Sequence, residues 1–105
     1  MTPATPDALA ARCTWLRARL EALPSLTTAT KDAGSDWIAV RTRRAQALDA
    51  LCDLMRAMPD RPRIADSGHV GRVTMLGLAA TSTMGIDGAL WNWLGRAEAA
   101  VREAA

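Results

Sequence analysis

Hydrophobic residues recur at helical spacing in three separate stretches of the chain. In the first stretch, apolar residues follow at alternating intervals of four and three: Leu9, Cys13, Leu16, Leu20 and Leu23. This spacing places them in one seam along a helix, of the kind that packs against a neighbouring helix. Thr5 is a suitable N-cap, Pro6 a suitable first residue, and Pro24 ends the pattern. The pattern therefore predicts a first helix between these two prolines.

The second and third helical stretches are longer. After a polar connection over residues 24–34, Ser35 is a candidate N-cap for a helix that runs to Met58. The C-terminal half of this helix carries a broad apolar face: Ala47, Leu48, Leu51, Leu54, Met55 and Met58. A last helix is expected over residues 83–104, with N-caps offered by the hydroxyl residues 81–83. Its main face comprises Ile86, Leu90, Leu94, Ala97 and Val101.

The pattern is less regular at the start of the second helix. Trp37 and Val40 continue the apolar face there, but Arg41 and Arg44 stand where apolar residues are expected. Nothing in the sequence explains why two arginines interrupt the stripe.

Residues 72–80 are compatible with two structures. They could form a short strand, or a helix capped by Ser67. A lone strand cannot satisfy its own backbone and needs a partner strand, for example from a second copy of the chain. Because no second strand is evident in the sequence, a helix is favoured. The expected fold is therefore all-α: a small bundle of three main helices plus one short element near residues 72–80, in a single domain over residues 1–105.

Length and composition agree with one small domain. A chain of 105 residues can bury one core but not two. Its hydrophobic content of 50% excludes a disordered class, and no apolar run approaches the roughly 18 residues that a membrane span requires. Residues 1–9 lack the pattern of a secretory signal, and Cys13 and Cys52 fall inside helical patterns. A cytoplasmic location is therefore expected.

The sequence lacks a recognisable catalytic or metal-binding set. His69 is the only histidine, and its spacing from Cys13 and Cys52 does not match that of a zinc site. No base is positioned to activate the hydroxyl residues 81–83, and no carboxylate pair stands in an apolar setting. The sequence therefore predicts a protein that is not an enzyme and uses no cofactor.

Phe and Tyr are absent, so four tryptophans supply the large aromatic rings. Trp15 projects about 120° from the leucine seam, with Arg12 and Arg19 as its neighbours on the helix surface. Trp91 and Trp93 widen the apolar arc of the last helix to about 160°, more than one core-facing stripe needs. A three-helix monomer cannot cover all three rings. We therefore expect these five residues to bind another protein or a second copy of the chain.

Two alternatives stay open. In the first, each indole closes the edge of the chain's own core beneath an arginine side chain, in a cation–π contact. In the second, Trp37, Arg41 and Arg44 form a nucleic-acid surface that stacks on bases and binds phosphate. Nucleic acid is the less favoured partner, because the net charge is only +2 and no helix-turn-helix signature is present.

The stretch from Gly77 to Trp93, GLAATSTMGIDGALWNW, resembles segments of small uncharacterised proteins from phages and prophages of GC-rich bacteria. Short accessory proteins of mobile elements commonly act by occluding a host protein or by joining an assembly. The resemblance therefore implies a protein that binds a partner, as an inhibitor of a host system or, alternatively, as a virion or scaffold component.

Overall fold

The computed structural model describes residues 5–24, 36–67 and 69–104, without the side chains of Asp36 and Trp37. Within these ranges the chain forms three helices and a three-stranded antiparallel sheet. The helices are α1 (Pro6–Glu21), α3 (Asp36–Arg56) and α4 (Gly85–Ala104), and the strands are β1 (Arg63–Asp66), β2 (Gly71–Met75) and β3 (Leu78–Ser82). The fold is α+β, so the all-α bundle predicted from the hydrophobic pattern is wrong.

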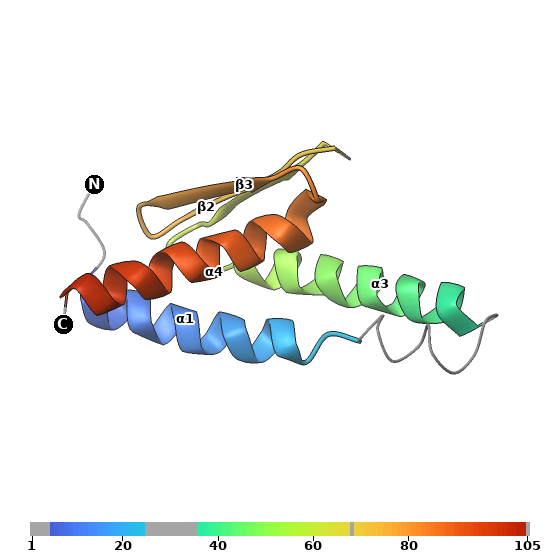
Figure 1. The fold of residues 1–105 in the computed structure, drawn as a ribbon, viewed down its shortest axis with the longest axis horizontal. Coiled ribbons are helices and arrows are strands. Elements are labelled where there is room, and N and C mark those ends of the chain that lie inside the picture. The colour runs from blue at the N-terminus through green and yellow to red at the C-terminus, as the bar shows by residue number, and fades with distance from the viewer. Residues whose placement is uncertain (1–4, 25–35, 68, 105) are drawn as a thin grey trace.

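Helix α4 is the central element of the fold (Figure 1). The sheet covers one side of α4, and α1 runs antiparallel along another side. Helix α3 contacts β1 near its C-terminal end, while its N-terminal half extends beyond the other elements. The core therefore lies mainly around α4, between the sheet and α1.

The seam of α1 confirms the first helix predicted from the sequence. All five of its apolar side chains are buried: Leu9, Cys13, Leu16, Leu20 and Leu23. The Thr5 Oγ1 caps the helix by accepting a hydrogen bond of 3.1 Å from the backbone N–H of Ala8. Since full burial of such a side chain contributes about 1.5–3 kcal/mol, this seam is a major source of the attachment between α1 and α4.

The sheet replaces the short element expected near residues 72–80. In β2, Val73 and Met75 are buried while Arg72 is exposed, which is the period-two alternation of a half-buried strand. The sequence disfavours a strand there because no second strand is evident in it. The structure places the partner strand, β1, at residues 63–66. The favoured helix is therefore also wrong.

Strands β2 and β3 are joined by a two-residue turn, Leu76 and Gly77, with φ angles of 52° and 80°. Positive φ at both central positions is typical of a type I′ turn, whose twist matches that of the flanking strands. Glycine adopts this conformation freely, but leucine does so rarely. Leu76 is packed against the hydrophobic core, which offsets the strain of its backbone. The usual signal of such a turn is Asn-Gly or Asp-Gly, so the Leu-Gly pair concealed the hairpin.

Gly71 allows the sheet to approach α4 closely. A Cβ atom at this position would overlap the backbone of Gly85 and Ile86 at the start of α4, and a packed backbone cannot move aside as a flexible side chain can.

We expect Gly71→Ala to lower the free energy of unfolding by about 1–3 kcal/mol, measured by urea denaturation. Gly95→Ala is the control, because a Cβ on this exposed position of α4 meets open space. It should be neutral or stabilise by up to about 1 kcal/mol. Equal stabilities of the two variants would contradict the close approach.

Candidate functional site

Trp93 lies in the core and not on the surface. Its side chain is 0% exposed, and its Nε1–H donates hydrogen bonds to the carbonyl oxygens of Met75 at 3.1 Å and Leu78 at 3.2 Å. These two residues flank the hairpin turn, so the indole attaches the hairpin to α4. Trp93 was predicted from the sequence to lie on a docking surface, but in the structure it is buried and inaccessible to a partner.

Trp91 of α4 and Trp15 of α1 remain partly accessible. They lie beside two different flanks of α1. Trp91 is 38% exposed, and the guanidinium of Arg17 lies 5.9 Å from its ring centre. Trp15 is half-buried against the core, and the guanidinium of Arg19 lies 5.3 Å from its ring centre. Because Trp15 and Arg17 are two positions apart on a helix, their side chains diverge by about 200°. The two partly accessible rings therefore do not form one surface.

Arg17 connects α1 to α4 on the flank of Trp91. Its guanidinium donates to the two carboxylate oxygens of Glu98 at 2.7 and 3.0 Å and to Glu21 at 3.2 Å. The hydrogen bond from Arg17 is the main reason that the pKa of Glu98 is lowered. Since Arg17 already has two carboxylate partners, the flank of Trp91 offers little unpaired charge to a ligand.

Arg12 and Asp60 form a bidentate pair that connects the middle of α1 to the segment after α3. The two hydrogen bonds measure 2.7 and 3.1 Å, and both side chains are mostly covered. The hydrogen bond from Arg12 lowers the pKa of Asp60 below its ordinary value of 3.8. A lowered carboxyl pKa stabilises the fold above that value, and the contribution is lost as the pH falls through the lowered pKa. Arg12 therefore supports the fold and does not present a free cation.

Arg44 interrupts the apolar stripe of α3 because it makes bonds across the fold. Its guanidinium donates to one carboxylate oxygen of Asp87, in the first turn of α4, at 2.8 and 3.2 Å. It also donates to the backbone carbonyl of Pro24, just after α1, at 2.9 Å. Arg44 is thus committed within the chain, which weakens the nucleic-acid surface predicted from the sequence. In that predicted set, Arg41 is exposed and the side chain of Trp37 lies outside the described residues.

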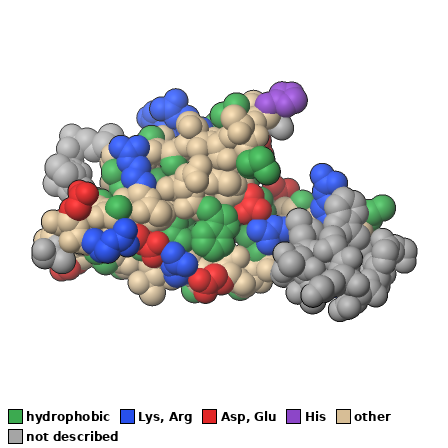
Figure 2. Space-filling view, viewed as in Figure 1, with side chains coloured by type: hydrophobic (Ala, Val, Ile, Leu, Met, Phe, Trp, Pro, Cys, Tyr) green, Lys and Arg blue, Asp and Glu red, His purple; other side chains and the backbone are tan. Residues whose placement is uncertain are grey.

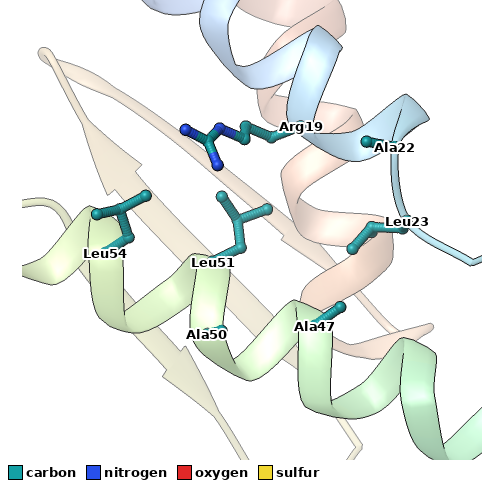
Figure 3. Close-up of a pocket in the computed structure, with 7 residues that line it drawn as sticks. All are labelled: Arg19, Ala22, Leu23, Ala47, Ala50, Leu51 and Leu54. Atoms are coloured by element: carbon teal, nitrogen blue, oxygen red, sulfur yellow. The ribbon is translucent and has the colours of Figure 1, made fainter.

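An apolar groove lies between the end of α1 and the middle of α3 (Figure 3). We call it the α1–α3 groove, and its volume is about 300 Å³. Its lining consists of Arg19, Ala22, Leu23, Ala47, Ala50, Leu51 and Leu54. Leu54 is 45% exposed, although the sequence pattern assigned it to the core-facing side of its helix. The groove therefore leaves apolar surface of both helices open to a ligand.

Arg19 brings the groove and Trp15 together into one surface. Arg19 lines the groove, and its guanidinium lies over the ring of Trp15. Within the described part of the chain, this exposed arginine has no carboxylate partner. Of the five residues predicted to bind a partner, the structure therefore joins two at a candidate site. The sequence does not show the groove because it depends on how α1 and α3 lie relative to each other, which the spacing of apolar residues within each helix does not determine.

No protein-family model, curated protein or solved structure matches the chain. Across the three described ranges, no group of three or more His, Cys, Asp or Glu side chains is placed to hold a metal ion. The helices within those ranges are too short or too polar to cross a membrane. The α1–α3 groove is therefore assigned as the candidate site on its geometry and charge.

The different roles of the two tryptophans of α4 can be tested by mutation. Trp93→Phe removes the donor to two hairpin carbonyls and shrinks a buried ring, so we expect it to lower the free energy of unfolding by about 1–3 kcal/mol. Trp91→Phe is the matched control and should change this free energy by at most about 0.5 kcal/mol. Both values come from urea denaturation. A larger loss for Trp91→Phe than for Trp93→Phe would contradict the assigned roles.

Proposed function

We propose that this chain is a non-enzymatic protein-binding module that receives an amphipathic helix of a partner protein in the α1–α3 groove. The observation that carries the proposal is an open apolar groove with Arg19 at its edge, an arginine with no carboxylate partner in the described ranges. Docking of an amphipathic helix into a hydrophobic groove is a recurrent mode of protein recognition. Trp and Arg are enriched among the residues that dominate binding free energy, and Trp15 adjoins Arg19 here.

The small residues of the groove support a helix as the ligand. Ala47 and Ala50 lie three positions apart on α3, so they share one face with Leu54, four positions further on. Ala22 faces them from the end of α1 (Figure 3). Because alanine side chains are short, a helix seated between α1 and α3 could bring its own large apolar residues against Leu54. Each Å² of apolar surface covered in this way contributes about 25 cal/mol.

Arg19 also favours another protein over a second copy of this chain. A twofold dimer through the groove would place the same surface on both sides of the interface, with Arg19 of each copy in it. Like charges at one interface disfavour that pairing, whereas a carboxylate of a partner would complement the guanidinium. The proposed ligand is therefore a helix with an apolar stripe flanked by acidic residues.

The proposed biological role follows from this mode of binding. A small module that covers a helix of its partner prevents other proteins from using that helix. Together with the resemblance of residues 77–93 to phage and prophage proteins, this supports a role as an inhibitor that occludes a host protein.

The proposed location is cytoplasmic. Cys13 and Cys52 are free and buried, and burial raises the pKa of both thiols, which lowers their reactivity.

The groove can be tested with a displayed library of amphipathic helical peptides whose flanking positions are randomised. Selection on the wild-type chain should enrich peptides with acidic flanking residues. Leu54→Glu places a carboxylate in the groove, so it removes an apolar contact and repels those residues. We expect it to weaken the selected peptides at least about tenfold, measured by fluorescence anisotropy.

Ile38→Glu provides the matched control. It introduces the same charge on α3, at a side chain that is 66% exposed and about 24 Å away along the helix axis. This variant should bind the selected peptides like the wild type, and circular dichroism should show equal helical content for both variants. The proposal is wrong if no peptide is enriched, or if the enriched peptides bind the Leu54→Glu variant unchanged.

A further inference from the structure

The sheet buries one face against α4 and leaves its other face open. Strand pairing arranges the open face in two rows: Arg63–Thr74–Ala79 and Ala65–Arg72–Thr81. Side chains alternate along a strand, so these six residues lie opposite the buried Val73 and Met75. We call this surface the outer sheet face. It contains only arginine, threonine and alanine.

Three arginines cluster on or beside the outer sheet face. Arg63 and Arg72 are diagonal neighbours across β1 and β2, at a separation of about 7–8 Å. A hollow of about 410 Å³ is lined by both of them and by Thr74. A second hollow of about 190 Å³ is lined by Arg61, Arg63 and Thr74, so the two hollows adjoin. Figure 2 shows basic side chains over the sheet, on the side away from the helices.

These arginines are not neutralised by carboxylates of the chain. Arg61, Arg63 and Arg72 are all exposed, and none of them takes part in an ion pair within residues 5–24, 36–67 and 69–104. Asp60 lines the smaller hollow, but it is committed to Arg12. The outer sheet face therefore concentrates positive charge, although the net charge of the chain is only +2.

We propose that the outer sheet face binds the phosphate backbone of a nucleic acid through Arg61, Arg63 and Arg72. The planar guanidinium group donates paired hydrogen bonds that suit phosphate oxygens, and the hydroxyl of Thr74 supplies a neutral donor between them. Alanine and threonine side chains are short, so a sugar–phosphate chain can lie close to the strands. This site is distinct from the α1–α3 groove and uses none of its residues.

The composition of the outer sheet face favours phosphate over an acidic protein segment. Protein interfaces combine arginine with large apolar or aromatic anchors that fill pockets of the partner, and this face has arginines but no such anchor among its six residues. Phosphate binding needs no such anchor, because release of condensed counterions supplies its free energy. The face also lacks an aromatic ring for base stacking. Binding is therefore expected to be independent of nucleotide sequence.

The edges of the sheet are less open than its outer face. On the β1 edge, Arg56 of α3 donates a hydrogen bond to the carbonyl of Ile64. On the β3 edge, Asn92 and Arg96 of α4 donate to backbone carbonyls of the strand. A peptide strand that extended the sheet would have to displace these side chains, and edge pairing is accordingly disfavoured. The accessible ligand surface of the sheet is its outer face.

The test is a titration of a labelled DNA duplex with the full chain, followed by fluorescence anisotropy over a series of salt concentrations. The logarithm of the association constant should fall linearly with that of the salt concentration, with a slope of about −0.9 per phosphate contact. The double variant Arg63→Ala/Arg72→Ala should reduce the magnitude of this slope by about two and weaken binding for every duplex sequence alike.

The control variant Arg43→Ala/Arg102→Ala removes the same charge from exposed positions on α3 and α4. Its slope should equal that of the wild type. The proposal is overturned if the wild type does not bind the duplex at low salt, or if both double variants lose affinity equally. It is also overturned if polyglutamate binds as tightly as the duplex with the same dependence on Arg63 and Arg72. Leu54→Glu should leave duplex binding unchanged, so failure at the groove and failure at the sheet are distinguishable.

Discussion

The structure depends on the buried indole of Trp93. Its ring lies in the core, and its N–H bonds the two carbonyls on either side of the hairpin turn. A buried N–H without a partner would cost about 1–3 kcal/mol, so the helix and the hairpin must keep this one register. Gly71 then allows the other end of β2 to contact the start of α4. The sheet occupies one side of α4, and the leucine seam of α1 packs along another side of the same helix.

The two proposed binding surfaces are those that this core leaves uncovered. Because the sheet and α1 both pack on α4, α3 lies at their side, and a groove with alanines in its walls runs between α3 and the end of α1. The sheet has a helix on one face only, so its arginine-bearing face stays open. On the helices, Arg12, Arg17 and Arg44 are paired with carboxylates of the chain, whereas Arg19 and the sheet arginines have no carboxylate partner among the described residues and stay available for ligands.

The sequence predicted the helices well because their spacing is a local property, visible within each segment. It failed for the sheet because pairing is not local: β1 has little apolar alternation, and Leu76 is an unusual residue for a type I′ turn. The same failure misplaced Trp93. The wide apolar arc of α4 exceeds what a neighbouring helix can cover, but the sheet covers the part that includes Trp93 and leaves Trp91 partly exposed. Trp15 and Arg19 were identified correctly as lying together because they are neighbours on one helix, whereas the groove depends on the packing of two helices that are distant in the sequence.

If Trp93 joins the sheet and α4 into one cooperative unit, the two must open together. Native-state amide hydrogen exchange measures this directly. The amides of Val73 and Ala80, which are paired in the middle of the sheet, should have the same free energy of opening as those of Leu90 and Leu94 in α4, close to that of global unfolding. Exchange of the sheet amides through an opening that leaves α4 protected would contradict the central role of the indole.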